Sequence, residues 1–325
     1  MGSKITGFGA YLPPEALTNA KLEGMVETNN EWIVQRTGIE ERRIARDEGT
    51  AALAVKAARN ALADAGRTPD ELDLIIAATV TPDCFTPSTA CLVQAGLNAA
   101  NAAAFDLSAA CSGFVYALDT ADSFIRAGKF RTVLILGAET LSRLVNYADR
   151  STCILFGDGA GAAVVEASEE PGILSTYLWA NGAGGGVLRA QALPQNEDPF
   201  GARQPLGIAE RAVAMAGGEV LRFSLSEAPR AMDEALKRAG LTIADIDWVI
   251  PHQANKRIID GIIRRYHLPP EKVYVNIERY GNTSSATIPI CLAEMRERGL
   301  LHGGQRLLLV GFGGGLTAAS AIVQI

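Results

Sequence analysis

Three side chains suited to nucleophilic catalysis stand where predicted strands give way to predicted helices. Cys111 follows the stretch AAAFDLS, His252 follows WVIP, and Asn282 lies in RYGNTSSA. In a parallel sheet the C-terminal ends of the strands line the ligand crevice. We therefore expect these side chains to face one cleft, in which a thiol with a polar partner acts as a nucleophile.

The setting of Cys111 predicts a reactive thiol. An amphipathic helix is expected to start beside it, and the unpaired N–H groups and dipole of a helix N-terminus lower thiol pKa values. Its small neighbours Ala109, Ala110, Ser112 and Gly113 let a substrate reach the backbone, whose N–H groups can bind an oxyanion. The alternative is a structural cysteine buried in the core. We assign that structural role to the remaining cysteines, which are Cys84, Cys91, Cys153 and Cys291.

The proposed partners of Cys111 also have simpler interpretations. Asn282 could serve only as a helix N-cap, a common role of asparagine. The other histidines are weaker candidates than His252, because His267 follows a predicted helix and His302 lies in a predicted loop. The shared position of Cys111, His252 and Asn282 at strand ends favours catalysis.

Composition and charge narrow the range of functions. The chain is 48% hydrophobic and 20% charged, and its net charge of −6 argues against a general nucleic-acid binder. It shows no signal-sequence pattern at Met1 and no apolar run of roughly 18 residues, so we expect no membrane insertion. Five cysteines without C-x-x-C spacing indicate free thiols in a reducing cytoplasm and no zinc site.

Two segments repeat at the same offset of 174 residues. ALADAGRTPDELDLII (61–76) and ALKRAGLTIADIDWVI (235–250) are identical at seven of sixteen positions. The same offset aligns VLILG (133–137) with LLLVG (307–311). We infer a duplication, with an N-terminal half at 1–170 that carries the thiol and a C-terminal half at 171–325 that carries His252 and Asn282.

Each half alternates short apolar strands with longer helices, which predicts an α/β fold with a mainly parallel sheet in each half. The segment 181–216 is rich in Gly and Pro and is expected to be a long loop or lid. Strands are predicted at 4–11, 74–80, 102–108, 132–138, 160–166, 172–180, 247–251, 273–277, 306–311 and 317–325. Helices are predicted at 51–65, 87–98, 111–127, 217–239, 255–266 and 283–298.

Several motifs, taken in order, give the chain a resemblance to a known family. It resembles the β-ketoacyl-acyl-carrier-protein synthase III family of thiolase-like condensing enzymes over nearly its whole length. The resemblance implies a five-layered α/β/α/β/α fold, a homodimer, and a catalytic triad at Cys111, His252 and Asn282. The motifs are EWIVQRTGIEERR (31–43), DLSAACSGF (106–114), FGDGAGAAVV (156–165), HQAN (252–255), YGNTSSA (280–286) and FGGG (312–315).

The resemblance also implies a reaction that needs no cofactor. Cys111 attacks the thioester of an acyl-CoA primer, expected to be acetyl-CoA, while the N–H groups of Cys111 and Gly314 hold the oxyanion. Malonyl-acyl-carrier protein then loses CO2. A neutral His252, through an N–H, and Asn282 donate hydrogen bonds to the enolate, which attacks the acyl-enzyme and gives 3-ketoacyl-acyl-carrier protein.

Binding residues follow from the same resemblance. It implies that the pair Trp32 and Arg36, with Arg150, sandwiches the adenine of CoA and meets its phosphates, where stacking and Arg–phosphate pairing supply affinity. It also places an acidic carrier protein against the basic helix that follows His252. The simpler interpretations are a core tryptophan with solvated arginines and a solvated basic face. The implied CoA contacts are Thr28, Trp32, Arg36, Arg150 and Asn255, and the implied docking residues are Lys256, Arg257 and Arg264.

One motif departs from the family pattern. GGGLTAASA carries Leu316, Ala318 and Ala319 where an aromatic residue and Trp-Gly are expected, which bears on acyl-chain selectivity rather than on the chemistry.

Rival functions lack their own signals. A thiolase needs a second cysteine near this segment, and a hydroxymethylglutaryl-CoA-type synthase needs a glutamate within 78–90. Chalcone-synthase-like enzymes lack the Trp-x-x-x-Arg pairing, and the chain has no G-x-x-x-x-G-K-[ST] phosphate loop. A condensing enzyme with a different primer and a non-catalytic acyl-CoA-binding protein remain alternatives.

Overall fold

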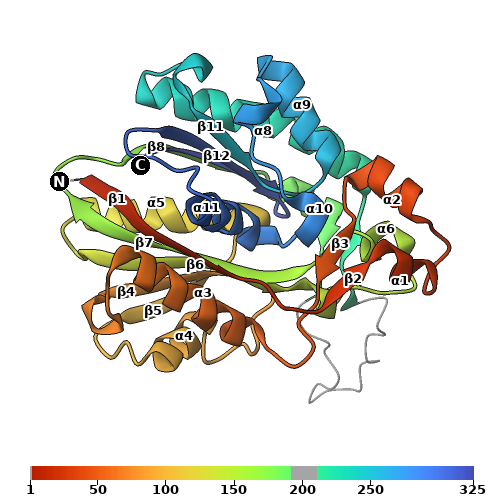
Figure 1. Ribbon diagram of the computed structural model, residues 1–325, viewed down its shortest axis with the longest axis horizontal. Coiled ribbons are helices and arrows are strands. Elements are labelled where there is room, and N and C mark those ends of the chain that lie inside the picture. Colours follow the sequence, from red (N-terminus) through yellow and green to blue (C-terminus); the bar gives the residue numbers. More distant parts are fainter. Residues whose placement is uncertain (1, 192–210) are drawn as a thin grey trace.

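The computed structural model describes residues 2–191 and 211–325, and it has five layers (Figure 1). Two sheets stand face to face with a pair of helices between them, and further helices cover the outer face of each sheet. The first sheet has the order β1-β7-β6-β4-β5, and its strands are β1 (Gly2–Tyr11), β7 (Asp158–Ser168), β6 (Thr132–Thr140), β4 (Leu74–Ala78) and β5 (Ala103–Leu107). The second has the order β11-β12-β13-β8, with β11 (Trp248–Pro251), β12 (Arg306–Gly313), β13 (Thr317–Gln324) and β8 (Ile173–Ala180).

Each interface between layers has its own apolar core. α5 (Gly113–Arg126) and α11 (Thr287–Glu297) fill the central layer and contact both sheets. α3 (Thr50–Ala65) and α4 (Thr89–Leu97) cover the first sheet, whereas α8 (Gly217–Ala239) and α9 (Lys256–Tyr266) cover the second. Successive strand residues face opposite sides, so Ile75 packs against the outer helices while Ile76 packs in the central layer. The predicted α/β class and five layers are confirmed.

The smaller elements gather at one end of the molecule, near the C-terminal end of β6 (Figure 1). Two short antiparallel strands, β2 (Ala16–Thr18) and β3 (Glu41–Arg43), are connected through the helices α1 (Asn19–Glu23) and α2 (Asn30–Thr37). The helices α6 (Arg150–Cys153) and α10 (Ile277–Tyr280) lie beside them. Within the predicted loop 181–216, the described residues form a short 3-10 helix (Gly182–Val187) and a two-stranded ribbon. The ribbon pairs β9 (Leu188–Arg189) with β10 (Ala214–Met215), and residues 192–210 of that predicted loop lie outside the described residues.

Among the described residues each sheet is mainly parallel, as predicted, with one strand that runs against the others. In the first sheet β4 runs parallel to β5 and β6, but β7 is antiparallel to both β6 and β1. In the second sheet β11 runs parallel to β12, and β13 is antiparallel to both β12 and β8. In the second half only residues 314–316 join β12 to β13, and so short a connection favours antiparallel pairing over a helical crossover.

The prediction of a strand at 273–277 was wrong. Only a single bridge joins Val273 to Val249, although Tyr274 N–H still donates to Val249 O. The backbone hydrogen bonds that a longer strand would make are replaced by bonds to the Gln253 side chain. This side chain donates to Tyr274 O at 3.2 Å and accepts from Asn276 N at 3.1 Å. A buried side chain therefore replaces a neighbouring strand.

The repeat seen in the sequence has counterparts in the backbone. Gly66 and Gly240 end α3 and α8 in left-handed conformations, with φ of 64° and 68°. Capping boxes follow at the same offset, one from Thr68 to Glu71 and the other from Thr242 to Asp245. These features support the proposal that 1–170 and 171–325 are duplicated halves.

Among the described residues, no helix combines the length and the apolarity needed to cross a bilayer.

Candidate active site

Cys111 lies at a tight corner against the second sheet. It belongs to a one-turn 3-10 helix (Ala110–Ser112) between β5 and α5, and Ala110 takes a left-handed φ of 45°. A Cβ on Gly313 would lie 2.9 Å from Cys111 Sγ, so β12 approaches the thiol more closely than any larger residue allows. Thr317 Oγ1 lies within hydrogen-bond distance of Ala109 O at 3.1 Å, of Gly314 O at 3.0 Å and of Ser112 Oγ at 3.1 Å. It ties the Gly314 loop to the cysteine corner.

The sequence departure at Leu316 leaves this loop in place. Leu316 N–H donates to Asn181 O and Asn181 N–H donates to Leu316 O. The Leu316 side chain is buried and packs over Gly184. The smaller residue therefore closes against the 3-10 helix Gly182–Val187.

The expected lowering of the Cys111 pKa was wrong. Burial raises the pKa of this thiol to about 12, and the charge of Glu139 acts in the same direction. The Ser284 hydroxyl and the backbone of Cys111 and Gly314 lower the pKa by less. Desolvation outweighs the helix N-terminus, because the thiol is inside the central layer rather than in the solvent. A proton acceptor is needed if the thiol is to react.

His252 is buried and its ring is held from one side. Nδ1 lies 2.7 Å from Thr287 Oγ1, whereas Nε2 has no hydrogen-bond partner among the described residues. The Phe312 ring meets the imidazole edge to face at 5.2 Å. Burial lowers the pKa of His252 to about 3, so the imidazole is neutral at physiological pH, as the family resemblance implies.

Asn282 has its side-chain amide oriented by the backbone. Oδ1 accepts from Ser284 N–H at 2.8 Å, which leaves the NH2 group without a partner among the described residues. The residue follows α10 rather than a strand, contrary to the prediction, and makes an isolated bridge to Phe156. Oriented N–H donors of this kind suit an oxygen that gains negative charge.

The three predicted catalytic residues come from separate segments that meet in the central layer. Cys111 packs on Gly313 of β12, and His252 continues β11, which pairs with β12 at Val310. Ser285, three residues after Asn282, lies against Gly113 beside Cys111. A buried thiol, a neutral imidazole with a free Nε2 and an amide NH2 can form and use a thioester intermediate.

The predicted CoA residues cluster at the end where α2 and α6 lie side by side (Figure 1). The guanidinium carbons of Arg36 and Arg150 lie 4.6 Å and 4.7 Å from the centre of the half-buried Trp32 ring. Arg150 also donates to Glu27 O at 2.8 Å, and the adjacent Thr28 Oγ1 has no partner among the described residues. A flat ring flanked by exposed cations suits a nucleotide.

The predicted docking helix is less uniform than its sequence indicates. Lys256 forms an ion pair with Asp260 and packs on Gly38 after α2, so its charge is partly neutralised. Arg257 and Arg264 are exposed and form no ion pair among the described residues. Asn255 caps α9 by accepting from Arg257 N–H at 2.9 Å. The contact of Lys256 with Gly38 brings the start of α9 to the end of α2.

Sequence reasoning missed the residues behind the triad. Thr287 and Phe312 set the His252 ring, and the buried Glu139 approaches the turn after Asn282. The 174-residue offset offered one signal, because it aligns Ser285 with Cys111 and Gly311 with Gly137.

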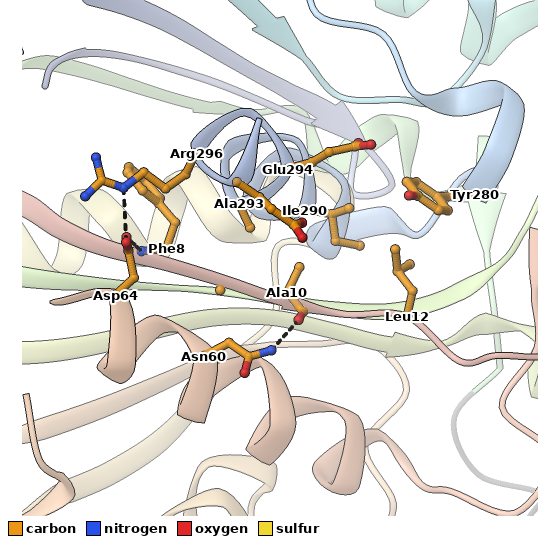
Figure 2. A pocket seen from close by; sticks show the side chains of 12 residues that line it. Phe8, Ala10, Leu12, Asn60, Asp64, Tyr280, Ile290, Ala293, Glu294 and Arg296 are labelled. Atoms are coloured by element: carbon orange, nitrogen blue, oxygen red, sulfur yellow. Dashed lines mark hydrogen bonds and ion pairs between the residues drawn. The ribbon is translucent and has the colours of Figure 1, made fainter. Parts of the chain in front are cut away.

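An open groove of about 410 Å³ lies away from these residues, between α3, β1 and α11 (Figure 2). Arg296 pairs with Asp64 across one end, and Glu294 pairs with Arg279 near the other. The lining of the groove includes none of the predicted site residues.

Comparison with known proteins agrees with this geometry. Two sequence models match the chain, "3-Oxoacyl-[acyl-carrier-protein (ACP)] synthase III" at residues 105–182 and its C-terminal counterpart at 236–325. A β-ketoacyl-[acyl-carrier-protein] synthase III of Clostridium novyi is 46% identical over 321 residues, with 99% of this chain and 98% of the relative covered. The chain belongs to the 3-oxoacyl-[acyl-carrier-protein] synthase III family. It is a condensing acyltransferase.

Solved structures of the family match over the full length. The synthase III of Aquifex aeolicus superposes with a TM-score of 0.92 at 47% identity, with both chains fully covered. The priming β-ketosynthase of the R1128 polyketide pathway superposes with a TM-score of 0.93 at 39% identity, covering 100% of this chain and 96% of that one. The fold is thus that of the condensing enzymes.

Proposed function

We propose that this enzyme condenses an acyl-CoA primer with malonyl-acyl-carrier protein in the first elongation step of fatty-acid synthesis. The observation that carries the proposal is the meeting of Cys111, His252 and Asn282 in one buried layer, with Nε2 and the amide NH2 both free within the described residues. The products are 3-ketoacyl-acyl-carrier protein, CoA and CO2. The primer and the malonyl thioester are substrates, and every step uses side chains of the protein itself.

In the first half-reaction, Cys111 attacks the carbonyl carbon of acyl-CoA. The thiol proton passes to His252 Nε2, since the pKa of about 12 keeps the thiol protonated in the resting enzyme. The N–H groups of Cys111 and Gly314 hold the tetrahedral oxyanion. Collapse of this intermediate breaks the bond to the CoA sulfur, which takes the proton from Nε2 and leaves as CoA.

The hydroxyl of Thr287 can pair with either tautomer of the His252 ring, and the two half-reactions use different tautomers. Its single proton has two acceptors in reach, Ser284 O at 3.0 Å and His252 Nδ1 at 2.7 Å. Directed at Ser284 O, it leaves Oγ1 to accept from Nδ1–H, and Nε2 carries the lone pair needed in acylation. Directed at Nδ1, it stabilises the tautomer with Nε2–H.

In the second half-reaction, malonyl-acyl-carrier protein replaces CoA and loses CO2. The electron pair of the broken C–C bond forms an enolate, whose oxygen accepts hydrogen bonds from His252 Nε2–H and the Asn282 NH2 group. The enolate carbon attacks the acyl-enzyme carbonyl, and the bond to Cys111 Sγ breaks. The thiolate then takes a proton from water.

Acylation is tested by intact mass after incubation with acetyl-CoA and longer acyl-CoAs. We expect the wild type to gain one acyl group and Cys111→Ser to gain none. A mass increase that survives Cys111→Ser would refute the nucleophile. Tight acyl-CoA binding without any acylation would favour the second candidate, a non-catalytic acyl-CoA-binding protein. The 39% identity to a priming ketosynthase makes the panel of longer primers necessary.

The site residues serve two binding partners. We propose that Thr28, Trp32, Arg36, Arg150 and Asn255 hold CoA, and that Lys256, Arg257 and Arg264 receive the acidic carrier protein. The exposed cations of α9 lie next to the CoA cluster through the Lys256–Gly38 contact, so both substrates enter from the same end.

We also propose a homodimer that works in the cytoplasm. β5 is an edge strand of the first sheet, and edge strands pair readily with another chain. Phe85, in the loop that precedes α4 next to this edge, is 68% exposed. Sedimentation at micromolar concentration tests this: we expect a dimer for the wild type and a weaker one for Phe85→Asp, whereas a monomeric wild type would refute it. Five free cysteines fit a reducing compartment.

A further inference from the structure

Glu139 is a fully buried carboxyl group that the reaction steps above do not use. It ends β6 in the layer between the sheets. It forms no ion pair among the described residues, although isolated buried charges are strongly disfavoured. Burial raises the pKa of the Glu139 carboxyl above its ordinary value, although polar groups of Thr81, Val80 and Ser285 surround it.

One oxygen of Glu139 is surrounded by donors. Oε2 accepts from Thr81 Oγ1 at 2.6 Å, from Val80 N at 3.1 Å and from Thr79 Oγ1 at 3.2 Å, and the Val80 N–H is shared with Oε1 at 3.3 Å. The two threonine hydroxyls themselves accept from backbone N–H groups, Thr81 from Thr140 and Thr79 from Thr81. Their protons therefore point to Oε2, which behaves as a carbonyl-type acceptor.

The other oxygen of Glu139 faces a hydroxyl that lacks a second proton. Ser285 Oγ lies 2.9 Å from Glu139 Oε1 and 2.9 Å from Ala78 O. A carbonyl carries no proton, and a serine hydroxyl has only one. Both contacts are satisfied when Oε1–H donates to Ser285 Oγ and Ser285 donates to Ala78 O. An ionised Glu139 would leave one of these close oxygen pairs without a proton.

Ser285 connects Glu139 to the catalytic turn. It is adjacent to Ser284, whose N–H orients Asn282 and whose C=O accepts from Thr287, the partner of His252. Gly137 lies two residues before Glu139 and so faces the same side of β6. A Cβ there would lie 2.3 Å from Ser285 O, so the strand and the turn are in backbone contact.

We propose that Glu139 is held as a neutral carboxylic acid and is the positioning residue for the 282–287 turn, so that Asn282 is correctly placed for condensation. This inference rests on the proposed role of Asn282. A neutral Glu139 also removes a negative charge that would otherwise oppose ionisation of the nearby Cys111 thiol.

The matched variants are Glu139→Gln and Glu139→Ala. A glutamine reproduces the neutral acid, because its C=O accepts from Thr79, Val80 and Thr81 while its NH2 donates to Ser285. We expect Glu139→Gln to decarboxylate malonyl-acyl-carrier protein within about 3-fold of the wild type, and Glu139→Ala to lose about 100-fold. Acylation by acyl-CoA should stay within about 3-fold in both variants, because Thr317 holds the Cys111 corner and Thr287, which orients His252, is anchored in α11.

Two further measurements keep the proposal falsifiable if Glu139→Ala does not fold. Ser285→Ala cuts only the link to the turn, and it should show the same selective loss of decarboxylation. Infrared difference spectra of wild type against Glu139→Gln should contain the C=O stretch of a protonated carboxyl group near neutral pH. A carboxylate band in its place would overturn the neutral acid.

The remaining outcomes are also decisive. A folded Glu139→Gln that is as inactive as Glu139→Ala would show that an ionised carboxylate is required, against the proposal. Equal loss of acylation and decarboxylation in Glu139→Ala and Ser285→Ala, or no loss, would refute a role through the turn. Asn282→Ala is the reference: if it decarboxylates normally, the proposed role of Asn282 fails regardless of Glu139.

Discussion

His252 Nδ1 and Thr287 Oγ1 lie 2.7 Å apart, and this contact alone holds the polar side of the imidazole within the described residues. The two residues come from different elements, β11 and the first turn of α11, and are 35 positions apart. Because Thr287 decides which ring nitrogen carries the proton, it links the fold to both half-reactions.

Replacing Thr287 should therefore show whether its contact with His252 serves catalysis or only the fold. Thr287→Val keeps the shape but removes the hydroxyl, so we expect the condensation rate to fall by about 100-fold with little change in the KM for the acyl-CoA. Thr287→Ser restores the hydroxyl and should regain most of the rate. A valine variant with the wild-type condensation rate would show that the contact is only structural.

The buried His252 makes stability depend on pH in a defined direction. Its pKa is about 3 in the folded state and near 6.5 when exposed, so the unfolded state binds more protons between these values and stability falls as the pH drops below 6.5. Between pH 8 and pH 5 this group should cost the wild type about 2 kcal/mol that His252→Gln does not lose. Urea unfolding of both proteins at the two pH values measures it. At pH 8 the imidazole is neutral in both states, which supplies the baseline, and parallel losses would contradict the assignment.

The Trp32 cluster should matter only for substrates that carry the nucleotide. Loss of base stacking in Trp32→Ala, or of the cation in Arg150→Ala, should raise the KM for acetyl-CoA about 10-fold. An acetyl thioester of N-acetylcysteamine lacks the nucleotide and should react equally with wild type and variants. Arg59→Ala, whose side chain bonds Gly96 O on the far side of α3, is the control arginine. Equal effects on both thioesters would argue against a CoA site.

Charge reversal on α9 should weaken only the carrier-protein step. In the double variant Arg257→Glu and Arg264→Glu we expect the KM for malonyl-acyl-carrier protein to rise about 10-fold at low salt. The effect should shrink as ionic strength increases, because exposed charges are screened. Acylation by acetyl-CoA should be unchanged, and Lys129→Glu, on the exposed turn after α5, should behave as wild type. An unchanged KM in the double variant would place docking elsewhere.

The alternation of strands and helices and the 174-residue repeat predicted the α/β class and the corners that carry the thiol and the imidazole, because both are local or nearly local signals. The five layers were implied only by the resemblance to the condensing-enzyme family. It did not predict how far burial would raise the pKa of Cys111, since that depends on β12 closing over the corner at Gly313. The strand at 273–277 failed because the Gln253 side chain, from another segment, takes its backbone bonds. Thr287 and Glu139 were missed because ordinary polar residues acquire importance only from the partners that the fold gives them.

The two corners that share the 174-residue offset have become specialised in different ways. Ala110 and Ser284 keep the same left-handed backbone, with φ of 45° and 50°, and each corner is received by a glycine of the opposite half, Gly311 or Gly137. One corner carries Cys111, whose sulfur forms and breaks the thioester bonds in the proposed mechanism, whereas Ser285 at the other forms only hydrogen bonds. We infer that an ancestor with two identical halves had two equivalent corners. In the present chain the corner at Cys111 carries the proposed nucleophile, and the corner at Ser285 supports the structure around it. Neither half on its own could then be an enzyme, because each supplies the glycine against which the corner of the other half packs.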